Sequence, residues 1–195
     1  MSLRRKLLIA LALVLLVRLY WIGHMVLFDI SGDAGRTILL YVIRFAPELI
    51  FILLGGLLLG PVWGASVGIA VALSGFVFNG LGIFSSVAFW HFPITALLKY
   101  VVLAVCAGIF VKRASSLKQT MLVVFCSLIL AYSSEMLITY FIDSYMLPLR
   151  TFLEIWVHLH GFGVLLQTIF VPLLYLALKR ALVPEPPAFF AKPLG

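Results

Sequence analysis

The chain consists of long apolar runs separated by short polar breaks, and this pattern restricts it to a structure that lies in a lipid bilayer. A membrane-spanning helix needs roughly 20 mainly apolar residues. Of the 195 residues, 64% are hydrophobic and only 11% are charged, a balance far outside that of soluble domains. About six spans with short connections use nearly the whole length. We therefore expect an all-α, multi-pass protein of the cell membrane.

The polar breaks set the expected boundaries of these spans. The second span is the least regular, because Arg44, Pro47 and Glu48 interrupt an apolar region that starts at Thr37. The residue before a proline avoids helical dihedrals, so two boundaries are open: the helix begins near Pro47 and residues 37–45 lie at the interface, or residues 37–45 belong to the second span. We expect spans at 7–28, 47–59, 62–78, 94–111, 119–142 and 158–178, with outer connections at 79–93 and 143–157. Residues 1–183 then form one transmembrane domain, and residues 184–195 form a Pro-rich cytoplasmic tail.

Glycines recur around the start of the third span. Gly60 and Pro61 indicate a tight turn, and Gly60, Gly64 and Gly68 follow one another at intervals of four residues. This spacing places small residues on one helix face, which lets a neighbouring helix approach closely within a membrane.

The basic residues indicate the orientation of the bundle. The net charge is +7, but the positive residues form short clusters between apolar runs, which is typical of topology signals and not of nucleic-acid binding. With both termini in the cytoplasm, the outer loops proper carry Arg36 and Arg150, and Arg44 lies in the segment 37–45. The inner segments then hold Arg4, Arg5, Lys6, Lys112, Arg113, Lys118, Lys179, Arg180 and Lys192.

Ionisable residues inside spans are costly, and each is a candidate for function. Lys99 and Glu135 lie at similar depths in the fourth and fifth spans, so we consider them as partners. Arg44 and Glu48 are four residues apart and would pair on one face of a helix.

Polar and aromatic residues gather at the expected outer end. Aromatic residues there are also typical of the membrane-interface belt. As substrate-binding candidates we select Trp90, His91, Lys99, Glu135, Tyr140, Arg150 and Trp156.

Motifs for metal binding and for nucleotide binding are absent from the sequence. There is no His-Glu-x-x-His and no phosphate-binding glycine loop. His158 and His160 are two residues apart and do not share a helix face, and Cys106 and Cys126 lie in apolar runs. We expect no enzyme activity, no cofactor and no metal.

Three stretches carry a resemblance to a known family. They are LLGGLLLGPVWGASVG at 53–68, TALLK at 95–99 continuing through Gly108 to Lys112-Arg113, and the segment from Asp143 through Pro172 to Lys179. With these stretches, the chain from Ala46 onward resembles the S component of an energy-coupling factor (ECF) transporter, of the vitamin or folate type. That family consists of small six-helix membrane proteins that bind vitamins.

The resemblance implies capture of a vitamin-like solute in an outward-facing cavity. It also implies, as partners, a transmembrane coupling subunit and two cytoplasmic ATPases that drive release of the solute inside the cell. Lys99 and Arg150 favour an anionic solute, and the aromatic residues favour a flat one. Apart from the solute, these subunits and the lipid bilayer, we expect no partner and no nucleic acid.

Other functions are compatible with the same residues. One is a membrane scaffold of the MreD (rod-shape) type, which binds a cell-wall partner instead of a solute. A second is an intramembrane enzyme that uses Glu135 and the histidines, and a third is the membrane part of a sensor.

Overall fold

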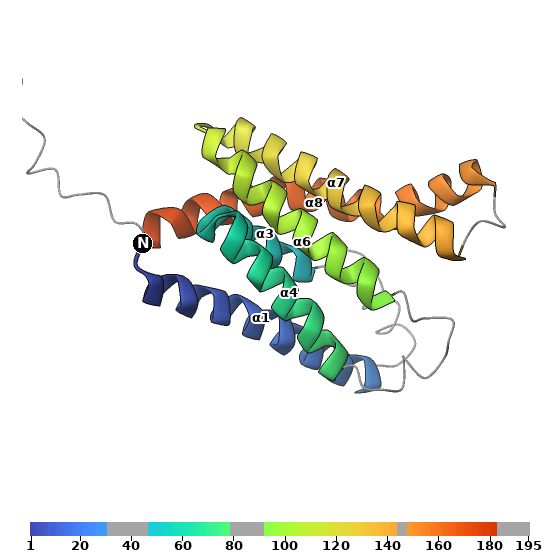
Figure 1. Ribbon diagram of the computed structural model, residues 1–195, viewed down its shortest axis with the longest axis horizontal. Helices are drawn as coiled ribbons and strands as arrows, with labels where there is room; N and C mark the ends of the chain where they lie inside the picture. The colour runs from blue at the N-terminus through green and yellow to red at the C-terminus, as the bar shows by residue number, and fades with distance from the viewer. Residues whose placement is uncertain (31–46, 79–91, 144–147, 183–195) are drawn as a thin grey trace, which may run out of the picture.

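The computed structural model describes residues 1–30, 47–78, 92–143 and 148–182, and this part of the chain is all-α (Figure 1). Its helices are α1 (Leu3–Ile30), α3 (Pro47–Leu59), α4 (Pro61–Phe78), α6 (Phe92–Phe110), α7 (Leu117–Asp143) and α8 (Leu149–Leu182), with a 3₁₀ turn, η2 (Val111–Arg113), after α6.

Four of these helices are long and apolar enough to cross a membrane, as in a multi-pass membrane protein. The candidate spans are Leu3–Gly23, Thr95–Arg113, Leu117–Phe141 and His160–Leu182. Two shorter apolar helices, Pro47–Leu59 and Pro61–Gly75, accompany them. The expectation of an all-α fold built from long apolar helices is therefore confirmed.

Many large apolar side chains are exposed on the surface of the helix bundle. Leu7, Leu11 and Leu15 on α1 are each more than half exposed, and Phe141 and Phe162 on α7 and α8 are more exposed still. A soluble monomer rarely presents apolar patches of this extent. Lipid tails are the solvent that suits such a surface.

The start of one helix, α3, agrees with the boundary expected from the sequence, whereas the start of α8 differs from it. The helix α3 begins at Pro47, as the proline predicted. The expectation of a connection over 143–157 is wrong, because α8 already begins at Leu149. Between Pro148 and His158 there is no glycine or proline to stop a helix. Arg150 and Glu154, four residues apart, form an ion pair that stabilises this first part of α8.

The helix α6 lies at the centre of the bundle. It packs against α3, α4 and α7; α1 packs along α3 and α4, and α8 packs on α7 and α3. Figure 1 shows the start of α1, the end of α8 and the α6–α7 hairpin at the same end of the molecule. The core between the helices consists of aliphatic residues, among them Leu49, Ile52, Leu53, Leu103 and Leu128.

Glycines let α3, α4 and α6 approach at backbone distance. A Cβ atom placed on Gly64 would lie 2.6 Å from the Cα atom of Gly56, and one placed on Gly56 would collide with the backbone carbonyl of Ala104. Gly68 faces the backbone of Tyr100 in the same way. The predicted close approach is thus confirmed for Gly64 and Gly68, whereas Gly60 has a φ of 88° and forms the turn between α3 and α4.

We predict that Gly64→Ala destabilises the bundle by about 1–3 kcal/mol, because the added methyl group forces α3 and α4 apart. Gly23→Ala is the matched control, since a Cβ atom there meets nothing within 4 Å. It should leave stability unchanged or slightly higher. Unfolding of the purified protein in mixed micelles measures both changes. Equal stability of the two variants would contradict this account of the packing.

Candidate functional site

Lys99 and Glu135 form an ion pair inside the bundle. The Nζ atom of Lys99 donates a hydrogen bond to Oε1 of Glu135 over 2.8 Å, and the two side chains are only 12% and 14% exposed. Lys99 lies seven residues from the start of α6 and Glu135 eight from the end of α7, which places both ~10–12 Å inside the helix ends. The pairing that their positions suggested in the sequence is confirmed.

Aromatic rings surround the charged end of Lys99. Its Nζ atom lies 5.6 Å from the ring centre of Tyr100 and 5.5 Å from that of Tyr132. The ring of Tyr132 in turn lies 4.6 Å from the imidazole of His160 on α8. The electron-rich faces of these rings stabilise the ammonium ion in addition to the carboxylate.

A second carboxylate, Glu48, lies in the first turn of α3, where the helix dipole favours negative charge. Its side chain is buried and is attracted by the charges of Lys99 and Arg18, while Glu135 repels it. The sequence suggested Arg44 as its partner, and Arg44 lies outside the described residues. Within them, Glu48 belongs to the same electrostatic group as the Lys99–Glu135 pair.

Arg18 completes this group from α1. It is 8% exposed, and its Nη2 atom donates a hydrogen bond to the backbone carbonyl of Val71 on α4. Fifteen residues separate it from the start of α1 and twelve from the end, too many for its side chain to reach either interface easily. Sequence reasoning treated Arg18 as an ordinary part of the first span and missed it. The detectable signal was a lone arginine in the middle of an apolar run.

These residues form one polar cluster that joins five helices. It contains two basic and two acidic side chains, which a tyrosine and a histidine border. The polar cluster comprises Arg18, Glu48, Lys99, Tyr132, Glu135 and His160.

Three buried atoms of the polar cluster have no hydrogen-bond partner among the described residues. They are Oε2 of Glu135, the hydroxyl oxygen of Tyr132 and Nε of Arg18. A buried polar atom without a partner costs about 1–3 kcal/mol. Such atoms in a native protein call for a physical explanation. Together they offer one acceptor, one donor and one hydroxyl that can act as either.

A pocket of about 450 Å³ lies beside the polar cluster, between α7 and α8. Tyr132 and His160 contribute to its wall, and the rest of the lining is mostly apolar. This volume is within the range of small-molecule sites, which combine apolar walls with a few polar groups. The remaining lining residues are Phe125, Ile129, Ser133, Met136, Leu153, Val157, Gly161, Val164 and Leu165.

The other candidates from the sequence lie elsewhere or outside the described part. Tyr140 is half-buried on α7, with its ring 5.8 Å from that of Phe141. Arg150 is 92% exposed and donates a hydrogen bond to Glu154 over 2.9 Å, so it does not join the polar cluster. Trp90 and His91 lie outside the described residues, as does the side chain of Trp156.

Metal-ligating side chains do not converge in the part of the chain that the structure describes. No group of three or more His, Cys, Asp or Glu residues there is arranged to hold a metal ion. Cys106 and Cys126 are both half-buried free thiols.

We predict that Lys99→Met lowers stability by about 3–5 kcal/mol, because it leaves Glu135 without its ion-pair partner and removes one of the two positive charges that attract Glu48. Adding Glu135→Met to this variant should restore part of the loss, since it removes the carboxylate that was left without a partner. Arg150→Gln, which breaks the exposed pair on α8, is the control and should cost less than about 1 kcal/mol. Unfolding in mixed micelles checks all three. A loss for Lys99→Met no larger than for Arg150→Gln would contradict the importance of the buried pair.

Comparison of the chain with protein-family models, with characterised proteins and with solved structures finds no significant match.

Proposed function

We propose that the protein is a solute-binding membrane subunit that captures a small molecule within the outer half of its helix bundle. The observation that carries this proposal is the polar cluster with its three unpartnered atoms, next to a pocket of about 450 Å³. Charged residues inside membrane helices mark pathways and binding sites for polar ligands. The function agrees with that implied by the resemblance to ECF-transporter S components.

The distribution of charge supports the orientation in this proposal. The start of α1, the end of α8 and the α6–α7 hairpin lie together in Figure 1. The basic residues of the described helix ends gather there, and basic residues favour the cytoplasmic side. In this orientation α3 and α4 are the second and third of six spans, both termini are cytoplasmic, and the polar cluster lies toward the outside. The residues at that end are Arg4, Arg5, Lys6, Lys112, Arg113, Lys118, Lys179 and Arg180.

The chemistry of the polar cluster limits the solute. The hydroxyl of Tyr132 belongs to the pocket wall and has no hydrogen-bond partner among the described residues, so it can donate to or accept from a polar group of the solute. The ring of Tyr132 and the aliphatic walls of the pocket suit a flat or apolar body. The solute is therefore a small molecule with a polar group on a flat or apolar frame.

Import of such a solute needs an energy source. We propose that a transmembrane coupling subunit and two cytoplasmic ATPases supply it, as they do for the S components that the sequence resembles.

The proposal predicts that the full chain, purified in mild detergent, carries a small molecule at close to one equivalent. Extraction of the sample followed by mass spectrometry identifies it. Repeated isolation without a small molecule, together with a cell-wall protein, would instead support the scaffold function and contradict solute capture.

A second prediction separates the effect of the Tyr132 hydroxyl on solute binding from its effect on the stability of the protein. Tyr132→Phe removes an unpartnered hydroxyl, so the empty protein should be at least as stable as the wild type. Its affinity for the identified solute should nevertheless fall by about 2–10-fold, which corresponds to one lost hydrogen bond. Isothermal titration with that solute measures the change.

The control is Tyr175→Phe, which removes the hydroxyl of another buried tyrosine near the basic end of α8. It should leave the affinity unchanged. Equal affinities of the wild type and Tyr132→Phe would remove Tyr132 from the proposed site.

A further inference from the structure

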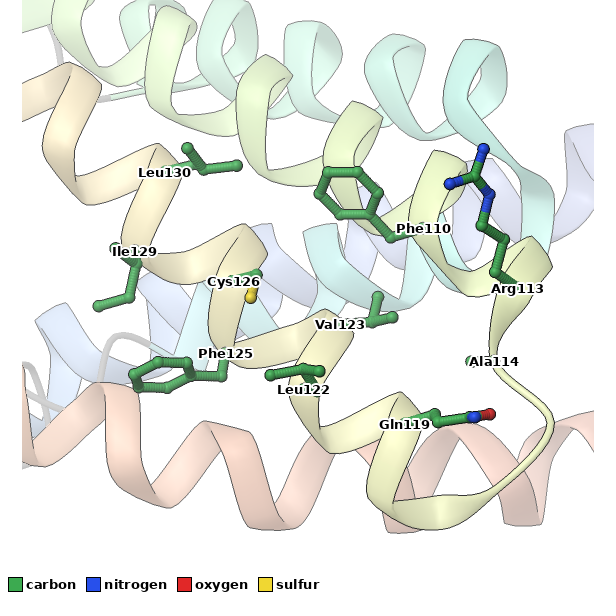
Figure 2. A pocket seen from close by; sticks show the side chains of 10 residues that line it. All are labelled: Phe110, Arg113, Ala114, Gln119, Leu122, Val123, Phe125, Cys126, Ile129 and Leu130. Atoms are coloured by element: carbon green, nitrogen blue, oxygen red, sulfur yellow. The ribbon is translucent and has the colours of Figure 1, made fainter.

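A second hollow lies on the surface of the bundle, along the hairpin of α6 and α7. Its volume is about 590 Å³, and its wall is apolar over most of its length. Figure 2 shows Phe110 on α6 and a row of side chains along α7, with Arg113, Ala114 and Gln119 at the hairpin end. We call it the hairpin groove; the rest of its lining is Leu122, Val123, Phe125, Cys126, Ile129 and Leu130.

The length of the hairpin groove matches one leaflet of a bilayer. Its lining on α7 runs from Gln119 to Leu130, a helical distance of ~16 Å. Half of a bilayer's hydrocarbon core is about 15 Å thick. A transmembrane helix of a partner protein would need a contact surface about twice as long. An acyl chain of a lipid in the leaflet at the hairpin end fits this length.

The hairpin end of the groove is positively charged. Lys112, Arg113 and Lys118 are exposed there, and residues 111–119 include no acidic residue. The hairpin is ordered by local hydrogen bonds, because Oε1 of Gln119 accepts from both the backbone N–H and the hydroxyl of Ser115. The cations are therefore held at the level of lipid headgroups, at the mouth of an apolar groove. Basic pockets in this position favour anionic headgroups.

We propose that the hairpin groove binds one anionic phospholipid, with an acyl chain along α7 and its phosphate at Arg113. The inference concerns a different ligand and a different place from the solute site, and it does not depend on the proposed function. The positive charge at the hairpin end favours an anionic headgroup. The length of the groove matches an acyl chain of a lipid in one leaflet.

Native mass spectrometry of the delipidated full chain tests this proposal by titration with two lipids of identical chains, dioleoyl phosphatidylglycerol and dioleoyl phosphatidylcholine. We expect one phosphatidylglycerol molecule to bind at least about five-fold more tightly than phosphatidylcholine, the preference expected from one cation at the headgroup. Arg113→Gln should abolish that preference and leave binding of phosphatidylcholine unchanged.

Arg180→Gln is the matched control, because it removes an exposed arginine at the same end of the bundle but on α8. It should keep the preference for phosphatidylglycerol. Cys126→Trp, which fills the groove, should weaken both lipids, provided that its circular dichroism and melting match the wild type.

Three results would overturn the proposal. The first is equal affinity of the wild type for the two lipids. The second is an equal loss of preference in Arg180→Gln and Arg113→Gln, which would indicate general attraction to the basic end. The third is a dimer mass that disappears in Cys126→Trp, which would show that a second copy of the chain covers the groove.

Discussion

The need to neutralise charge inside a membrane constrains the whole bundle. An isolated ion at this depth is very costly, so each buried charge must have an opposite charge nearby. Lys99 meets this need with Glu135 at 2.8 Å, and Glu48 lies in the field of both Lys99 and Arg18. Because these four residues come from α1, α3, α6 and α7, their electrostatic attraction links four helices of the bundle.

Close packing of the helix backbones brings the charged residues of the polar cluster to the same depth in the bundle. The helix α3 has only 13 residues, and its first turn, which carries Glu48, lies at the depth of the polar cluster. Gly56 and Gly64 let α3 and α4 approach each other and α6 at backbone distance. Pro47 suits the first position of a helix, where no N–H is needed, and the helix dipole favours Glu48 immediately after it. Packing and electrostatics therefore stabilise the same arrangement.

The helix α7 has a different chemical character along its length, and it contributes to both hollows. Its C-terminal half carries Tyr132 and Glu135 of the polar cluster, and its N-terminal half forms one wall of the hairpin groove. Phe125 and Ile129 line both hollows. The two hollows therefore share part of their walls.

The sequence by itself determined the all-α membrane fold, the start of α3 at Pro47 and the similar depths of Lys99 and Glu135, because these follow from local hydropathy, proline geometry and position along a helix. Only the tertiary structure decided that Lys99 pairs with Glu135, that Arg18 and Glu48 join that pair, that Arg150 instead pairs with Glu154 on the surface, and that α8 begins at Leu149. The direction of a side chain around its helix, and the helix that it meets there, depend on how all the helices pack. One-dimensional spacing gives the depth of a charge in the membrane, but its partners across the bundle are set by the packing of helices that are far apart in the chain.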